Sequence, residues 1–190
     1  MLISLVNYAL MFFVFSAIGW TIECIYCSIG NRKLITRGFL YGPVCPIYGT
    51  GALVFEILIT PLSDPIQKRW WLVVLVGMVL ADIVEYLTSY IMEKLFNARW
   101  WDYSNEKFNL HGRICLKHSI YWALATVAVI YIVQPFLQKH MERLVSDELR
   151  NFMIAFVGTV FIIDYVITWM NARKKKYRNT VSSDNRIIED

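Results

Sequence analysis

Five long apolar runs, separated by short polar stretches, dominate the chain. They extend from Leu2 to Ser28, Gly42 to Ile59, Trp70 to Leu95, Ile114 to Leu137 and Asn151 to Met170. A helix that crosses the hydrocarbon core of a bilayer needs about 20 mainly apolar residues. The pattern therefore predicts an all-α protein, a polytopic membrane helical bundle of about five transmembrane helices.

The second run is irregular at its start, where Gly42, Pro43, Pro46, Gly49 and Gly51 follow one another closely. Proline and glycine in such numbers do not support a uniform helix. Two interpretations remain open: a broken helix that lines a site within the membrane, and a cytoplasmic entry loop. We favour the broken helix, because interrupted helices mark the binding sites of many transporters.

The composition fits a single membrane domain. Of the 190 residues, 57% are hydrophobic and 18% are charged, and the charged residues cluster in a few connections and in a tail. We expect one transmembrane domain over residues 1–172 and a basic, then disordered, cytoplasmic tail over 173–190. The connections around Asp64–Arg69 and Lys139–Arg150 lie between spans, and we expect the second to be interfacial and partly helical.

Basic residues predict the orientation. With five spans, one side collects 14 of the 19 Lys and Arg residues and the other side collects 5. The side richer in basic residues faces the cytoplasm, which places the N-terminus outside and the C-terminus inside a plasma membrane crossed several times. The net charge of +4 is therefore attributed to membrane anchoring, and nucleic acid is excluded as a partner, since no amphipathic soluble scaffold presents a basic face.

Sequence motifs exclude several kinds of chemistry. The four cysteines include one C-x-x-C, Cys24 and Cys27, but a zinc site needs about four ligands at suitable spacing. We expect no metal and no cofactor. The G-x-x-x-x-G-K-[ST] motif of ATPases is absent, as are G-x-S-x-G and H-E-x-x-H. The chain therefore carries no recognisable ATPase site of its own.

The third span carries acids on one stripe. Asp82, Glu85, Ser89 and Glu93 fall on one helical face, and the first span presents Glu23 on a polar face of its own. Ionisable groups within a membrane are costly and usually face the bundle interior. We expect the two faces to meet around a polar centre near the cytoplasmic side. The alternative is that the acids are structural partners of arginines or backbone donors.

Basic groups and helix N-termini on the same side predict an anion site. Arg37 and Arg113 lead into the second and fourth spans, whose starts offer free N–H groups near Gly42 and Gly112. Such a site suits a phosphate or a carboxylate. Salt bridging among these same groups is the alternative. His118, one turn into the fourth span, is a candidate proton carrier or a hydrogen-bonded structural residue.

The longest connection, Phe96 to Arg113, carries an aromatic and acidic motif. Trp101, Asp102, Tyr103 and Ser104 follow one another in it. Aromatic residues at this position are typical of an interfacial belt, but the interleaved acid favours a loop that caps a cavity. The candidate polar centre comprises Glu23, Arg37, Tyr48, Asp82, Glu85, Glu93, Trp101, Asp102, Tyr103, Asn109, Arg113 and His118.

Several motifs, in order along residues 15–125, resemble those of a known family. They are Gly19-Trp20-x-x-Glu23, Arg37-Gly38-Phe39-x-x-Gly42-Pro43-x-x-Pro46-Ile47-Tyr48-Gly49, Glu85-Tyr86 with Glu93, Trp101-Asp102-Tyr103-Ser104, and Phe108-Asn109-x-x-Gly112-Arg113-Ile114-Cys115-Leu116. Together they are similar to the CmpB-like family of small bacterial ABC-transporter permeases. The resemblance implies a transport component of the bacterial plasma membrane, a separate ATPase subunit and a homo-oligomer.

Three functions compete. A transport component would line a substrate path with the acid stripe and the broken helix. A membrane-embedded enzyme would act on a lipid or isoprenoid headgroup, with Glu85, Glu93 or Asp102 as acid or base. A structural or regulatory subunit would use its polar residues only to hold helices together. We rank transport first, mainly on the family resemblance.

Overall fold

The computed structural model describes the backbone of residues 2–58, 69–137 and 146–188, and the side chains of residues 5–58, 69–137, 146 and 148–176. Its helices are α1 (Leu2–Asn31), α2 (Pro46–Leu58), α4 (Trp70–Phe96), α5 (Leu116–Ala128) and α7 (Asp147–Ile188), with a π-helical segment, η1 (Val129–Val133), directly after α5. Two short strands, β1 (Asn109–Leu110) and β2 (Ile114–Cys115), form one antiparallel hairpin. The Asp64–Pro65 connection and most of Lys139–Arg150 lie outside the described residues.

The predicted all-α membrane bundle is confirmed. Within the described residues, four helical stretches are long and apolar enough to cross a membrane: Leu5–Asn31, Trp70–Phe96, Leu116–Leu137 and Glu148–Lys176. The second predicted span is present as α2, whose 13 residues reach only about 20 Å at 1.5 Å per residue. Since a bilayer core is about 30 Å thick, α2 covers about two thirds of it.

The irregular start of the second span is also confirmed. Residues 42–45 are not helical, and the helix begins at Pro46, where a missing N–H costs nothing because the first N–H groups of a helix have no partner within it. Gly49 then lies against α1, where a Cβ would meet the carbonyl oxygen of Phe12 and the hydroxyl of Ser16. The glycine lets the two backbones approach closely, which is how small residues pack membrane helices.

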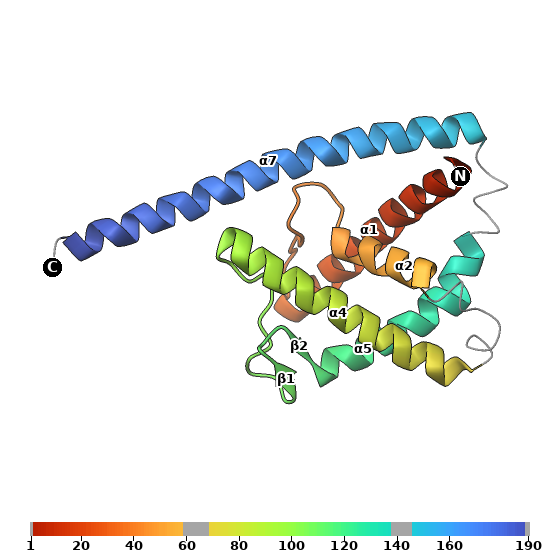
Figure 1. Cartoon of the computed structure of the whole chain (residues 1–190), viewed down its shortest axis with the longest axis horizontal. Helices are drawn as coiled ribbons and strands as arrows, with labels where there is room; N and C mark the ends of the chain where they lie inside the picture. Colours follow the sequence, from red (N-terminus) through yellow and green to blue (C-terminus); the bar gives the residue numbers. More distant parts are fainter. Residues whose placement is uncertain (1, 59–68, 138–145, 189–190) are drawn as a thin grey trace.

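Helices α4 and α5 run side by side in opposite directions (Figure 1). Their contact is tight at Gly77, where a Cβ would meet the side chain of the fully buried Thr126. Phe55 of α2 and Ala81 of α4 form a small buried core, with Trp122 packed against it. Glycine and alanine at these positions bring the polar face of α4 close to α2 and α5.

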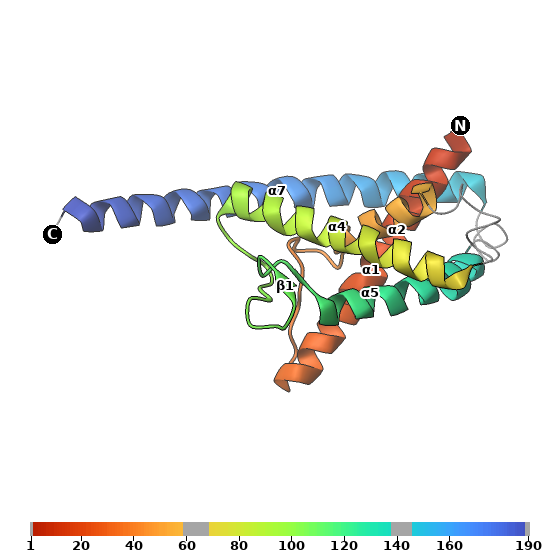
Figure 2. The same ribbon diagram turned by 60° about the horizontal axis from the view of Figure 1, so that its bottom comes forward.

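Helix α7 crosses the other side of the bundle and continues past it (Figures 1 and 2). It contains 42 residues, from Asp147 to Ile188. The backbone of the expected tail, residues 173–188, is therefore a continuation of this helix. The division of the chain at residue 172 stays a prediction.

Candidate functional site

The expected site residues gather toward the end of the bundle where α1 and α4 end and α2 and α5 begin (Figure 1). They form three groups, around Arg113 at the end of α4, around Glu85 deeper in the bundle, and around Glu23 between α1 and α2. The loop from Asn97 to Cys115 brings the first two groups together, because it folds back against the polar face of α4.

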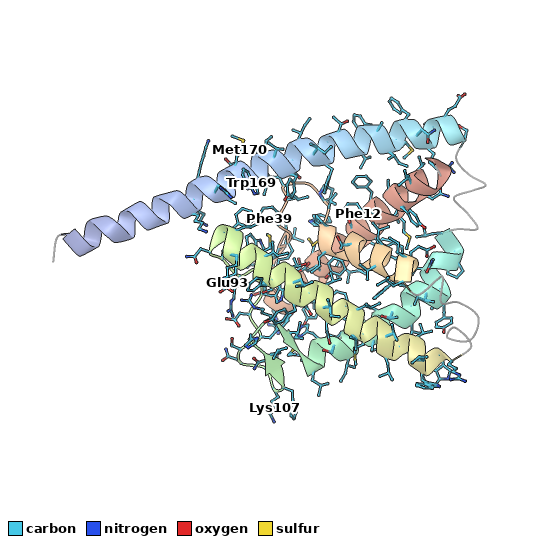
Figure 3. The ribbon with its side chains drawn as sticks, in the orientation of Figure 1. Phe12, Phe39, Glu93, Lys107, Trp169 and Met170 are labelled. Atoms are coloured by element: carbon cyan, nitrogen blue, oxygen red, sulfur yellow. The ribbon has the colours of Figure 1, made fainter. Side chains whose placement is uncertain are left out.

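The acid stripe of α4 faces inward, as its spacing predicts. Glu85 and Ser89 are each 4% exposed, whereas Glu93, one turn further on, retains 32% of its side-chain exposure. Figure 3 shows Glu93 at the end of α4, next to the loop. From Glu85 to Glu93 the stripe extends about 12 Å along the helix axis. The loop therefore reaches a polar group about three turns from the end of α4.

Arg113 is the centre of the first group. Its guanidinium forms an ion pair with Glu93 and donates a hydrogen bond of 3.1 Å to the Ser89 hydroxyl. The same guanidinium lies 5.7 Å from the ring centre of Tyr86 and 5.4 Å from that of Tyr90. With a side chain only 8% exposed, Arg113 supplies the donor that the buried Ser89 hydroxyl would otherwise lack.

A second arginine, Arg99, shares Glu93 with Arg113. Its Nε donates to Glu93 at 2.9 Å, and its Nη1 lies 3.8 Å from a carboxylate oxygen of Asp102. The hydrogen bond to Glu93 raises the pKa of Arg99. Asp102 accepts hydrogen bonds from the hydroxyl and the backbone N–H of Ser104, at 2.5 and 2.9 Å, and these two bonds lower the pKa of Asp102. The motif at residues 101–104 therefore folds as a turn tied to the end of α4.

The hairpin completes the loop. Gly112 has φ +69°, and a Cβ there would lie 2.6 Å from a carboxylate oxygen of Asp102, so only glycine fits. Its N–H donates to the side-chain oxygen of Asn109 at 3.0 Å, and the Asn109 amide donates to the carbonyl oxygens of Ser104 and Glu106. The predicted backbone anion site at Gly112 is therefore occupied by a side chain of the loop itself.

Glu85 is the centre of the second group and binds two donors. The Tyr103 hydroxyl donates to one of its oxygens at 3.0 Å, and the Trp122 indole donates to the other at 2.9 Å. Burial is the main cause that raises the pKa of Tyr103, and the negative charge of the neighbouring Glu85 raises it further. The ring of Tyr103 stacks on His118, with the ring centres 4.1 Å apart. Glu85 thus connects α4 to the loop and to α5.

Sequence reasoning did not single out Trp122 or Ser119. Both are polar groups on α5, and the Ser119 hydroxyl donates to Asp82 at 2.8 Å. Ser119 lies about one turn after Cys115, and Trp122 lies about one turn after Ser119. Residues three and four apart share a helical face, so this spacing could have indicated a polar stripe on α5. The other carboxylate oxygen of Asp82 is buried and has no hydrogen-bond partner among the described residues.

Two other expected residues serve the loop and the start of α5. The indole of Trp101 donates to the carbonyl oxygen of Arg113 at 2.9 Å, so it holds the arginine-bearing turn of the hairpin in place. His118 lies with its Nδ1 3.1 Å from the sulfur of Cys115. In these positions both side chains are hydrogen-bonded and structural in their contacts.

The third group joins α1 to the start of α2. The thiol of Cys45 lies 3.7 Å from Glu23. Tyr48 packs its ring against Trp122, at 5.7 Å between centres, and Trp122 donates to Glu85. Cys45 and Tyr48 therefore place the start of α2 between the α1 carboxylate and the partners of the α4 carboxylate.

Arg37 does not join the acids of α4. Its Nε donates to the sulfur of Cys27 at 3.1 Å and its backbone N–H to Cys24 at 3.2 Å. The bond with Cys27 raises the pKa of Arg37, and Glu23 adds a smaller electrostatic contribution in the same direction. The C-x-x-C pair thus receives the arginine-bearing loop at the end of α1.

The predicted anion site at Gly42 is occupied by a residue of α7. The carboxylate of Asp164 accepts the backbone N–H groups of Gly42 at 2.8 Å and Tyr41 at 3.1 Å, and the Thr168 hydroxyl donates to it at 3.0 Å. One turn beyond, the Asn171 amide donates to the Tyr41 hydroxyl at 3.3 Å. The signal in the sequence was an otherwise apolar last span with one acid deep inside it.

The hydrogen bonds of this site hold the loop 97–115 against α4 and connect α4 to α5. Among the described residues, no group of three or more His, Cys, Asp or Glu side chains is placed to hold a metal ion.

Comparison with protein families gives one match. Residues 10–169 match the model of the family described as "Putative ABC-transporter type IV". That description concerns transport and lends no support to the lipid-headgroup enzyme. No curated protein matches the chain. No solved structure matches it either.

Proposed function

Since the chain belongs to the ABC-transporter type IV family just described, whose model covers residues 10–169, we propose that it is the membrane-spanning subunit of an ATP-driven transporter. In this proposal the loop 97–115 and the α4 stripe form a polar clamp, centred on Arg113, that connects the cytoplasmic end of the bundle to its interior. The family supports the transport role, and the clamp is our assignment from the geometry.

The observation that carries the proposal is the depth to which one loop engages one helix. Arg113 pairs with Glu93 and donates to Ser89, and Tyr103 donates to Glu85. A movement of the loop would therefore pull on α4 over two full turns. A transport subunit needs such a connection, because ATP hydrolysis outside the membrane must rearrange helices inside it.

Glu85 extends the connection across the bundle. It accepts hydrogen bonds from the loop through Tyr103 and from α5 through Trp122, and the ring of Tyr48 on α2 packs against Trp122. Polar groups inside a membrane bundle hold helices in defined arrangements and mark transport paths. We place the path for the transported molecule along this face of α4, between α2 and α5.

The ATPase is a separate chain in this proposal, because no phosphate-binding motif of that class occurs in the sequence. The cytoplasmic side is the side of the loop 97–115 and of the end of α7, following the excess of basic residues there. The N-terminus is then outside and the C-terminus inside a bacterial plasma membrane. Four long helices and a short one are few for a transport path, which favours a homo-oligomer.

The test is reconstitution with the ATPase that co-purifies from native membranes. We expect the complex to show ATP-dependent transport, with ATPase activity that depends on this chain. Glu85→Gln and Arg113→Lys should each lower coupled activity several-fold while the complex stays assembled. Glu148→Gln at the start of α7 is the matched control, since it makes the same carboxyl-to-amide change at an exposed position away from the clamp.

Two results would contradict the proposal. One is a chain that purifies without an ATPase and whose loss leaves ATP-dependent transport unchanged. The other is coupled activity that Glu85→Gln and Arg113→Lys leave at the level of Glu148→Gln, which would remove the clamp from the mechanism and leave the family assignment standing.

A further inference from the structure

Helix α7 changes character abruptly near its passage over the end of α4. Its surface is apolar and exposed up to Met170, with Phe156 at 62%, Ile163 at 54% and Met170 at 47% exposure. Arg173, Lys174 and Lys175 follow directly, all exposed. No acid occurs between Asp164 and Asp184. The basic run therefore begins where the lipid-facing apolar surface ends.

Lys176 shows where the basic residues of α7 lie along the axis of α4. Its ammonium donates to the carbonyl oxygens of Lys94 and Leu95, at 3.1 and 3.2 Å. These are among the last carbonyls of α4, which carry the negative end of the helix dipole. The basic run on α7 consequently lies level with the end of α4, at the boundary between the hydrocarbon core and water.

Aromatic rings lie beside the cations at this boundary. The Arg173 guanidinium lies 4.5 Å from the ring centre of Trp169, and the Lys94 ammonium lies 5.6 Å from that of Tyr90. Figure 3 shows Trp169 and Met170 on the stretch of α7 near the end of α4. Tryptophan and tyrosine are typical of the headgroup level of a membrane, and cation–π contact holds each cation close to that level.

Among the residues whose side chains the structure describes, no ion pair neutralises the cations at this end of α4 and α7. The ion pairs between described side chains are Arg99–Glu93, Arg99–Asp102, Arg113–Glu93 and Lys117–Glu106. None of them involves Lys94, Arg173, Lys174 or Lys175. The described acids at this end, Glu93, Asp102 and Glu106, are thus paired with Arg99, Arg113 and Lys117. The described part of the α4–α7 end therefore keeps an excess of positive charge.

We propose that this surface, formed by Lys94, Trp169, Arg173, Lys174 and Lys175, binds the phosphate groups of anionic phospholipids in the inner leaflet. Basic residues immediately beyond a transmembrane helix recognise anionic headgroups. A lipid fits better than an acidic protein segment, because exposed apolar residues of α7 adjoin the cations and would contact the acyl chains of the same molecule. The proposal is independent of the transport role.

The experiment uses the full-length protein in detergent with an equimolar mixture of dioleoyl phosphatidylglycerol and dioleoyl phosphatidylcholine. Native mass spectrometry counts the bound molecules of each lipid. We expect phosphatidylglycerol to be retained several-fold over phosphatidylcholine. The triple variant Arg173→Gln, Lys174→Gln, Lys175→Gln should lower this preference by roughly tenfold or more, given the attraction of each basic residue for an anionic surface.

A matched control removes the same charge elsewhere. Arg32→Gln, Lys33→Gln and Lys107→Gln together also cost three positive charges at exposed positions, and they should leave the preference within about twofold, since they lie away from the α4–α7 end. Figure 3 shows Lys107 at the hairpin, on the other side of α4 from α7. Equal loss in both triple variants would show a dependence on net charge alone and overturn the assignment.

Two further arms distinguish the source of the anion. Inorganic phosphate at millimolar concentration should not displace phosphatidylglycerol, and a poly-glutamate peptide should not compete with it. Displacement by phosphate would make this a site for a free anion, and displacement by the peptide would make it a protein-docking surface. Either result, or an unchanged lipid preference in the Arg173–Lys175 variant, overturns the proposal.

Discussion

Removing the Arg113 side chain tests the clamp most directly. In Arg113→Ala, the buried Ser89 hydroxyl loses its donor, which costs about 1–3 kcal/mol. The two ring contacts, with Tyr86 and Tyr90, contribute about 0.5–1 kcal/mol each. Glu93 does not become an uncompensated buried charge, because Arg99 stays paired with it. The variant should therefore lose about 3 kcal/mol of stability, or roughly a hundredfold in the unfolding equilibrium.

Two companion variants separate the possible causes. Arg113→Lys keeps the charge but lacks the planar fork that reaches Glu93 and Ser89 together, so it should recover less than half of the loss. Arg99→Ala removes the other arginine that pairs with Glu93. The Arg99 side chain is 31% exposed. Because solvent screens this exposed pair, Arg99→Ala should cost clearly less than Arg113→Ala.

The assay is unfolding of the purified protein in mixed micelles by added sodium dodecyl sulfate, followed by far-ultraviolet circular dichroism. The reasoning predicts the order of midpoints wild type, Arg99→Ala, Arg113→Lys, Arg113→Ala, from the most to the least stable. Arg113→Ala unfolding at the same midpoint as Arg99→Ala would refute it, since the burial of Arg113 would then contribute nothing.

Three other expectations rest on single contacts. Gly77→Ala should destabilise the α4–α5 packing by about 1–3 kcal/mol in the same assay, whereas Gly51→Ala, where a Cβ meets nothing within 4 Å, should be neutral or mildly stabilising. Asp164→Asn should cost about 1–2 kcal/mol by weakening the bonds from two loop amides, and hydrogen exchange of those amides should quicken; unchanged exchange would count against the contact. Asp102 has a lowered pKa, so its contribution to the loop is complete above its ordinary value of 3.8 and disappears as the pH falls further; loop exchange protection should drop there, and Asp102→Asn should show no such step.

The membrane bundle could be predicted from the sequence because apolar length is a local property. About 20 apolar residues in a row are required of any helix that spans a bilayer, and the runs of the chain meet this condition without reference to one another. The break before Pro46 was also readable, since proline and glycine act on their own stretch of backbone. The inward direction of Asp82, Glu85, Ser89 and Glu93 followed from helical periodicity alone.

The partners of these acids could not be predicted with the same success. Arg37 and Arg113 were equal candidates, as both precede a helix on the same side. In the structure, Arg113 pairs with Glu93 of α4, whereas Arg37 donates hydrogen bonds to the sulfurs of Cys24 and Cys27. Nothing local distinguishes the two arginines, because the choice depends on which loop folds over α4.

What the sequence by itself determined is the class of protein, the membrane spans, the family and the face of α4 that turns away from lipid. The tertiary structure decided that the N–H of Gly42 donates to Asp164, more than a hundred residues away along the chain, and that Glu85 accepts a hydrogen bond from Trp122 of α5. The physical reason is that burial and helical period are set by neighbours along the chain, whereas hydrogen-bond partners are set by which distant segments the packing of helices brings within 3 Å.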